Sequence, residues 1–241
     1  MAHEETSFGL GQWITDLAAI VEEGPRRAFL AAQPQARGRE AVDILYHAVV
    51  TFARVDLKKA GRVAEASSWV AEELNDPYAT AQSARAVGHV LYLTGKYKNA
   101  IGEYEKALKI FARMGREVDY ARTISGALQS LIYDGQYERA FRLGEQARSI
   151  FHAHKDRLRL ARLDSNMANI QYRQDRFQEA VELYEGAYRE FLQCGEALDI
   201  LPLALIDVDA DDRQQWEAAA GIVAARYYRC PFTIDMFPES K

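Results

Sequence analysis

An internal repeat with a constant spacing of 40 residues constrains the fold of this chain more than any other feature of its sequence. Three segments align at that spacing without a gap, 81–113, 121–153 and 161–193. Four columns carry identical residues: Ala100, Ala140 and Ala180; Glu105, Glu145 and Glu185; Ala107, Ala147 and Ala187; and Phe111, Phe151 and Phe191. This agreement predicts a fold in which one structural unit recurs and each copy packs on its neighbours.

Each repeat unit is predicted to be a pair of helices joined by a tight turn. In the first unit Asp76 and Pro77 form a helix start, because aspartate caps free N–H groups and proline suits the first helical position. The first helix is predicted over 77–93, with Gly95 in the turn because glycine adopts a positive φ at little cost. The second is predicted over 97–112, where apolar residues recur at i, i+3 and i+4.

Small residues explain how the paired helices approach each other. Ala100 contributes to a groove on the second helix of the first unit, and Gly88 on the first helix can enter it. Tyr97 is expected to fill the wedge toward the next unit. The second unit departs from this plan, since Leu128 stands at the small position and Gly144 at a large one. We expect these two positions to have exchanged volume.

The spacing of Gly88, Gly95, Tyr97, Ala100 and Ala107 resembles the tetratricopeptide repeat. The usual unit has about 34 residues, and the 40-residue spacing is similar to the longer variant found in bacterial regulatory and CHAT-associated arrays. The resemblance implies an all-α fold, a right-handed α-solenoid of stacked antiparallel helix pairs. It covers 81–195 well and 37–77 weakly.

These patterns divide the chain into four parts. They are an N-terminal capping region, 1–36; a degenerate helix pair, 37–76; three repeats, 77–199; and a divergent C-terminal capping helix with an apolar tail, 200–241. Within the first part, 11–23 has an apolar stripe that includes Trp13 and Leu17, and Gly24-Pro25 is predicted to end that helix. A membrane-surface helix is the rival interpretation, which the acidic residues and the absence of an early basic residue disfavour.

Composition narrows the function further. The formal net charge is −5, and no basic patch with interleaved aromatic residues stands out, so nucleic acid is not an expected partner. Two distant cysteines, no signal-peptide pattern and no membrane-length apolar stretch predict a cytoplasmic protein with reduced thiols and no membrane partner.

Catalytic, metal and cofactor motifs are weak or missing in the sequence. The acidic run 207–212 lacks the glycine and the glutamate that a calcium loop requires, which favours a solvated linker. His152 and His154 have no complementary ligand set nearby. We therefore predict no catalytic residues, no metal and no cofactor, and a protein that is not an enzyme.

The resemblance also implies where a ligand binds. In such repeats the first helix of each unit lines the concave groove. Carried onto this chain, the groove positions are Arg85, His89 and Tyr92; Arg122, Ser125 and Gln129; and Arg162, Ser165, Asn166, Asn169, Tyr172 and Arg173. Guanidinium groups bind carboxylates in a bidentate manner, which favours an acidic peptide or a C-terminal carboxylate. The alternative is that the arginines pair with Asp119, Asp164 or Glu117 and serve solubility.

The predicted function is a scaffold or adaptor that binds a peptide or protein segment in its groove. Two alternatives remain open. The chain could be the N-terminal regulatory or sensor module of a larger effector such as a CHAT-type peptidase, or a structural module that self-associates through its C-terminal end.

Overall fold

The computed structural model describes residues 11–194, and every regular element in that range is a helix. The chain divides into two compact units, Met1–Lys155 and Asp156–Lys241. The expected C-terminal helix, the apolar tail and the acidic run 207–212 lie outside the described residues.

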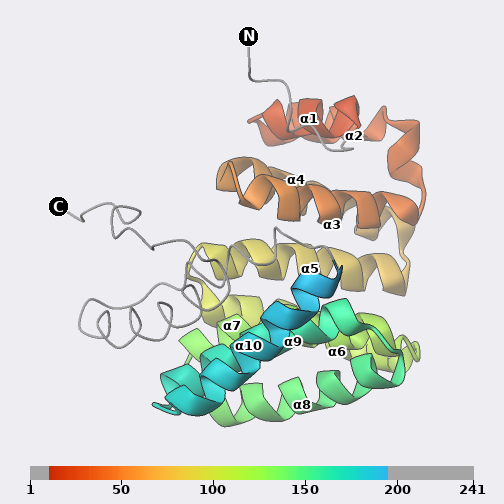
Figure 1. Cartoon of the computed structure of the whole chain (residues 1–241). Helices are drawn as coiled ribbons and strands as arrows, with labels where there is room; N and C mark the ends of the chain where they lie inside the picture. Colours follow the sequence, from red (N-terminus) through yellow and green to blue (C-terminus); the bar gives the residue numbers. More distant parts are fainter. Residues whose placement is uncertain (1–10, 195–241) are drawn as a thin grey trace, which may run out of the picture. The chain divides into compact units, whose positions relative to one another are not determined.

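The first unit contains α1 (Gln12–Ala19), α2 (Glu23–Ala31), a short 3-10 turn η1 (Pro34–Arg37), α3 (Glu40–Ala53), α4 (Leu57–Leu74), α5 (Pro77–Leu93), α6 (Tyr97–Arg113), α7 (Glu117–Tyr133) and α8 (Tyr137–Ala153) (Figure 1). The second unit contains α9 (Arg157–Arg173) and α10 (Phe177–Cys194). The two helices predicted for the first full repeat are confirmed, and the second of them extends one residue further, to Arg113.

Helices of the first unit form two layers. Each helix from α3 to α7 packs on the next one along the chain, and α5 also packs on α3 and on α7. The helices α4 and α6 form no comparable contact with each other. The layer of α3, α5 and α7 is therefore continuous, whereas the layer of α4, α6 and α8 is more widely spaced. This arrangement of stacked helix pairs is that of an α-solenoid, as predicted.

The helix boundaries follow the predicted capping chemistry. Asp76 Oδ1 accepts a hydrogen bond from the Ala79 N–H at 2.9 Å, and Pro77 occupies the first turn of α5. Gly95 has a φ of +73°, and its N–H donates to the Tyr92 carbonyl at 3.0 Å. The Lys96 N–H donates to the Leu91 carbonyl at 2.9 Å, so two free carbonyls at the end of α5 are satisfied.

The alanine columns lie where the repeat predicts them. Ala100 and Ala140 are fully buried, and Ala180 is 2% exposed. Phe111, at the end of α6, is also fully buried. In the second compact unit, Phe191 on α10 packs in a cluster with residues of α9. The phenylalanine at this position of the repeat is therefore buried in both compact units.

A tyrosine occupies the space that the glycines of α5 and α7 leave open. A Cβ built on Gly88 would lie 3.2 Å from the ring of Tyr104, which comes from α6, and a Cβ on Gly126 would lie 3.4 Å from it. Gly88 therefore makes room for an aromatic ring rather than only entering a groove beside Ala100. In the second repeat Leu128 and Gly144 are both buried, and the volume exchange between them stays a prediction.

The predicted end of the N-terminal helix is wrong. The first helix, α1, already ends at Ala19, and Gly24 and Pro25 lie in the first turn of a second helix, α2. Proline is tolerated there because the first N–H groups of a helix have no intrahelical partner. Arg26 joins the two helices by donating to the carbonyls of Ile20 and Val21 at 3.1 and 2.9 Å.

The apolar stripe of α1 faces protein rather than solvent. Ile14 and Leu17 are fully buried, and α1 packs on α4. The side chain of Arg62 on α4 donates to the Ala18 carbonyl at 2.6 Å. No helix among residues 11–194 is long and apolar enough to cross a membrane.

Candidate functional site

The predicted groove residues of the first unit lie on α5 and α7, next to residues of α3 that the sequence did not single out. Two contacts connect the three helices. Tyr46 of α3 contacts Arg85 of α5, and Tyr92 of α5 contacts Tyr133 of α7. We call this surface the α3–α5–α7 face. Its members are Tyr46, Arg54, Arg85, His89, Tyr92, Arg122, Ser125, Gln129 and Tyr133.

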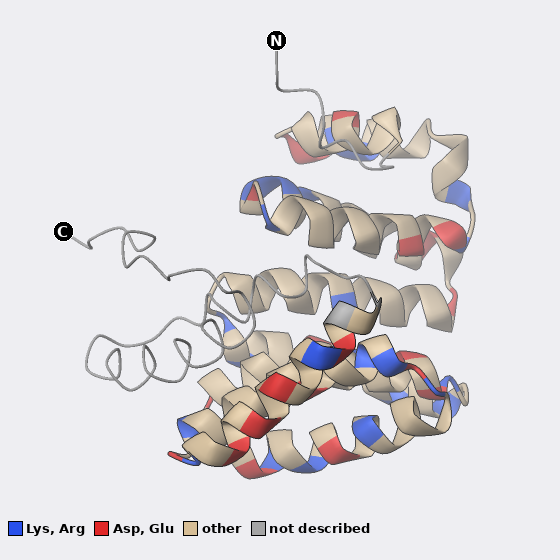
Figure 2. Ribbon diagram, viewed as in Figure 1, with Lys and Arg blue, Asp and Glu red and all other residues tan. Residues whose placement is uncertain are grey.

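Arg85 is the only charged residue of α5, a helix that is tan over most of its length in Figure 2. Its side chain is buried. The guanidinium donates to Gln82 Oε1 at 2.6 Å and to the Tyr46 hydroxyl at 3.2 Å, and it lies 4.5 Å from the centre of the Tyr46 ring. Gln82 donates in turn to Asp43, which also accepts from the Tyr78 hydroxyl at 2.8 Å. This network holds α5 on α3 and places a positive charge just below the surface.

His89 is held neutral on this face. Burial, and then the positive charges of Arg85 and Arg54, lower its pKa to about 4. The imidazole therefore offers one donor and one acceptor at neutral pH instead of a charge. It suits hydrogen bonding to a peptide backbone better than pairing with a carboxylate.

An aromatic cluster extends the face across α5, α6 and α7. The rings of Tyr97 and Tyr133 are stacked, with centroids 4.9 Å apart and an interplanar angle of 11°. Tyr92 lies 6.2 Å from each of them. Burial, with smaller contributions from Tyr133 and Tyr97, raises the pKa of Tyr92 to about 12, so its hydroxyl stays protonated. Tyr133 is 40% exposed, so part of its side chain faces solvent.

The sequence reasoning missed Tyr133, although a signal existed. Tyr133 falls 40 residues after Leu93, so the two share a column, and Leu93 is also exposed for a large apolar residue. Two large apolar side chains exposed in the same column mark a surface that packing within the repeat does not explain. The Tyr97 stack also confirms that this aromatic fills the wedge toward the next unit.

The charges on α7 and α3 differ in how they are compensated. Arg122 pairs with Asp119 at 3.4 Å, which confirms the alternative of local pairing for this arginine. Asp119 also binds Arg116 at 2.6 Å. Arg54, by contrast, is exposed, and no hydrogen bond or ion pair within residues 11–194 engages its guanidinium. Ser125 and Gln129 lie half-buried on α7.

The other six predicted residues lie together on α9 in the second unit. Ser165 Oγ donates to the Ala161 carbonyl at 3.1 Å, and Asn169 Oδ1 accepts from the Tyr184 hydroxyl. Tyr172 meets Phe177 edge-on at 5.5 Å. The remaining three are Arg162 and Arg173, which are exposed, and Asn166, which is half-buried.

Among the described residues, no group of three or more His, Cys, Asp and Glu side chains could hold a metal ion. His154, one of the two histidines considered as ligands, lies 3.2 Å from a carboxylate oxygen of Glu117. What the α3–α5–α7 face offers is a set of preformed hydrogen-bonding groups, exposed aromatic surface and positive charge.

Comparisons with known proteins agree with the helical-repeat architecture. A family model described as "SNAP: Soluble NSF attachment protein, SNAP" matches residues 22–194. No curated protein matches the sequence. Solved structures share the fold, and two of them serve as examples. A STAND (signal transduction ATPase with numerous domains) protein with a tetratricopeptide repeat sensor from Pyrococcus horikoshii is 17% identical, with a TM-score of 0.59 over 86% of this chain. BtubC (BKLC) from P. vanneervenii is 19% identical, with a TM-score of 0.53 over 97% of this chain and 99% of that chain. The chain spans 34% of the length of the STAND protein, about a third.

Proposed function

Because this chain belongs to the soluble NSF attachment protein family, a family of helical-repeat adaptors, we propose that it binds an acidic segment of another protein on its α3–α5–α7 face. The family's name describes an attachment protein. The helical-repeat architecture of the family supports a protein-interaction module.

One observation carries the proposal, namely the arrangement of charge on the α3–α5–α7 face. The carboxylates that contact residues of the face or their partners are already engaged, since Asp43 accepts from Tyr78 and Gln82 and Asp119 pairs with two arginines. Its exposed cation, Arg54, has no such partner within the described part of the chain. The face therefore retains uncompensated positive charge in a protein whose formal net charge is −5. A carboxylate is the ligand that relieves this imbalance.

The polar and aromatic groups suit an extended segment. Gln129 offers both a donor and an acceptor, and neutral His89 does the same, so each can pair with one peptide group. The exposed ring of Tyr133 can cover an apolar side chain of the segment. Because the surface is already formed by packed helices, little ordering of the adaptor opposes binding.

The residues on α9 extend the proposal to the second unit. Arg162 and Arg173 are exposed on α9, and Asn169 carries an amide that can pair with a backbone. We propose that these residues of α9 form, within the second unit, a contact surface of their own for a protein segment. A regulatory role in a larger effector of the CHAT type, self-association through the C-terminal end and a cytoplasmic location remain predictions.

The proposal is tested with a displayed peptide library selected against the full chain. The selected peptides are then compared, by fluorescence anisotropy, with versions in which Asp and Glu are replaced by Asn and Gln. We expect the selection to enrich acidic peptides and the amide versions to bind at least tenfold more weakly. Replacing Arg54 with Glu should weaken binding about tenfold or more, because an attraction becomes a repulsion.

Arg142→Glu is the matched control. Arg142 is exposed on α8, in the other layer, so the same change of net charge there should leave affinity nearly unchanged. Equal weakening by both reversals would show that only long-range charge is sensed. Enrichment of basic or uncharged peptides would refute the proposed ligand class.

A further inference from the structure

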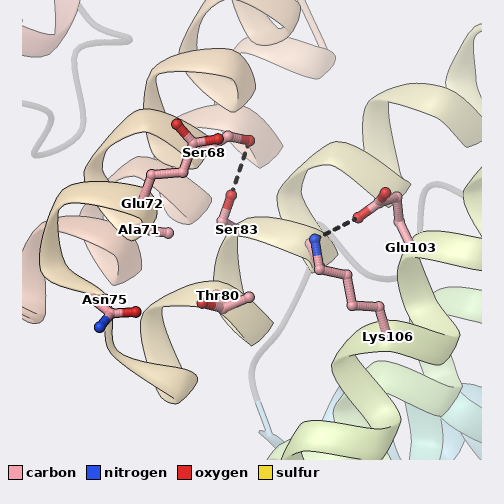
Figure 3. Close-up of a pocket in the computed structure, with 9 residues that line it drawn as sticks. Ser68, Ala71, Glu72, Asn75, Thr80, Ser83, Glu103 and Lys106 are labelled. Atoms are coloured by element: carbon pink, nitrogen blue, oxygen red, sulfur yellow. Dashed lines mark hydrogen bonds and ion pairs between the residues drawn. The ribbon is translucent and has the colours of Figure 1, made fainter.

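A polar pocket lies on the opposite side of α5 from the contacts that form the α3–α5–α7 face. It has a volume of about 340 Å³, within the range of roughly 300–1,000 Å³ typical of ligand sites. Residues of α4 and α6 form its walls, and α5 forms its floor (Figure 3). The side chains that carry the argument are Ser68, Glu72, Asn75, Ser83, Glu103 and Lys106.

The pocket exists because of the spacing of the outer layer. The helices α4 and α6 both pack on α5 but form no comparable contact with each other. The residues of α5 beneath the gap are small, Thr80, Ser83 and Ala84, so no long side chain fills it. This opening is thus a consequence of the sequence of α5 and not of a missing element.

The floor of the pocket carries two hydroxyl oxygens that can each accept a hydrogen bond from a ligand. Ser68 Oγ and Ser83 Oγ lie 3.1 Å apart and share one hydrogen bond, in which either atom can be the donor. Ser68 Oγ also lies 3.4 Å from the Ala64 carbonyl oxygen. Ser83 is 4% exposed, and a hydroxyl oxygen with two lone pairs can still accept from a donor that enters the pocket.

Carboxylates on the two walls point to a positively charged donor. Glu72 on α4 has no hydrogen bond or ion pair within residues 11–194. Glu103 on α6 has only a long ion pair, 3.9 Å, with Lys106. Two carboxylates and one ammonium leave a net negative site, and Asn75 adds a further carbonyl oxygen at the rim.

We propose that this pocket binds the guanidinium of an arginine side chain from a partner protein. The planar guanidinium carries five N–H donors and no acceptor, so it can donate to Ser83 on the floor and to carboxylates on the walls. An ammonium has a smaller set of donors and less reach between walls. Lys106 competes with the ligand, because its ammonium already neutralises part of the charge of Glu103.

This site is independent of the proposed function. It takes a basic side chain, whereas the α3–α5–α7 face takes an acidic segment, and the two surfaces share no residue. Two partners, or two parts of one partner, can occupy the module together. The experiment below reports on the pocket alone, and acidic-peptide binding measured in parallel on each variant separates the two hypotheses.

The test is a titration of the ¹⁵N-labelled full chain with N-acetyl-arginine amide, followed by amide chemical shifts. We expect saturable shifts confined to α4, α5 and α6, at probe concentrations on the order of millimolar as for a single side chain. N-acetyl-citrulline amide, which has nearly the same shape without the charge, should cause no saturable shift. N-acetyl-lysine amide should bind more weakly than the arginine probe.

Substitutions of opposite sign make the test sharp. Glu72→Gln and Glu103→Gln should each weaken binding roughly three- to tenfold, whereas Lys106→Met should strengthen it by a similar factor. Glu73→Gln is the matched control, because Glu73 is exposed beside Glu72 but does not line the pocket. The proposal is overturned by shifts that lie elsewhere, by equal binding of citrulline, by equal weakening in the Glu73 variant, or by Lys106→Met weakening binding.

Discussion

Tyr104 packs next to two glycines, so we expect substitutions at residues 88 and 104 to be strongly coupled in their effect on the free energy of unfolding. The second repeat has a different pair of residues at the corresponding positions. In the first repeat Gly88 leaves space and Tyr104 fills it, so that a Cβ added at Gly88 would lie only 3.2 Å from the ring. In the second repeat the corresponding positions hold Leu128 and Gly144. Transplanting that pair, as Gly88→Leu with Tyr104→Gly, tests whether the two positions exchange volume.

The expected magnitudes follow from burial. Tyr104 is 3% exposed, so truncation should cost about 3–5 kcal/mol, as for other buried aromatic residues. Glycine in a helix interior adds about 1 kcal/mol. Gly88→Leu alone forces a side chain into the ring, an overpacking cost of roughly 3 kcal/mol. The double variant should lose only about 2–3 kcal/mol, which makes the coupling at least about 3 kcal/mol.

The assay is urea unfolding of the full chain, followed by circular dichroism, for the wild type and the three variants. A single variant that is unfolded while the double variant folds would demonstrate the coupling even more directly. If the two single losses add to the loss of the double variant within about 0.5 kcal/mol, the volume-exchange argument is refuted.

Three further predictions follow from the same structure. Gly102→Ala should stabilise the protein by about 0.5–1 kcal/mol, because nothing lies within 4 Å of the added Cβ in an exposed helix interior, whereas Gly88→Ala should destabilise it; urea midpoints measure both. Burial lowers the pKa of His89 to about 4, below the value of about 6.5 in an unfolded chain, so its contribution to stability is complete above pH 6.5 and is lost as the pH falls toward 4. Lowering the pH from 7 to 5 should therefore cost roughly 1–2 kcal/mol more in the wild type than in His89→Gln, and an equal pH dependence of the two unfolding free energies would contradict this. Arg85→Met should cost about 2–4 kcal/mol by breaking a buried network, while Arg54→Met should change stability by no more than about 0.5 kcal/mol; similar losses in thermal or urea unfolding would disprove the distinction.

The sequence predicts the fold well because its signals are local and repeated. Asp76 determines where α5 begins, because its side chain caps a free N–H group. Gly95 determines where α5 ends, because the turn requires a positive φ. Ala100 allows one close approach between two helices, and the buried alanine at the same position of each repeat allows the same approach there. The error at Gly24 and Pro25 has the opposite origin. The same dipeptide can end one helix or begin the next, and only the packing of α2 on α4 selects the second outcome.

The candidate site was predicted less completely, since its members depend on contacts between helices that lie about 40 residues apart. Sequence position places Arg85 on the face, but only the structure shows that Tyr46 and Gln82 hold its guanidinium below the surface. The pairing of Arg122 with Asp119, three residues away, was open to sequence reasoning because it is local. The stack of Tyr97 on Tyr133 was not, because nothing in one column specifies its partner in another.

The contrast between repeated and non-repeated positions indicates which residues of such a module can determine its specificity for a partner. The repeated columns are those whose side chains are enclosed by two helices, so each copy must satisfy the same volume. Positions that face a ligand carry no such constraint and are free to differ between copies. One column shows this clearly, since it holds Ala53, Leu93, Tyr133 and Arg173 in successive units. Under the proposed function, a segment bound to α5 and α7 meets a different group at each of these positions, so we expect the non-repeating columns to determine which partner is bound.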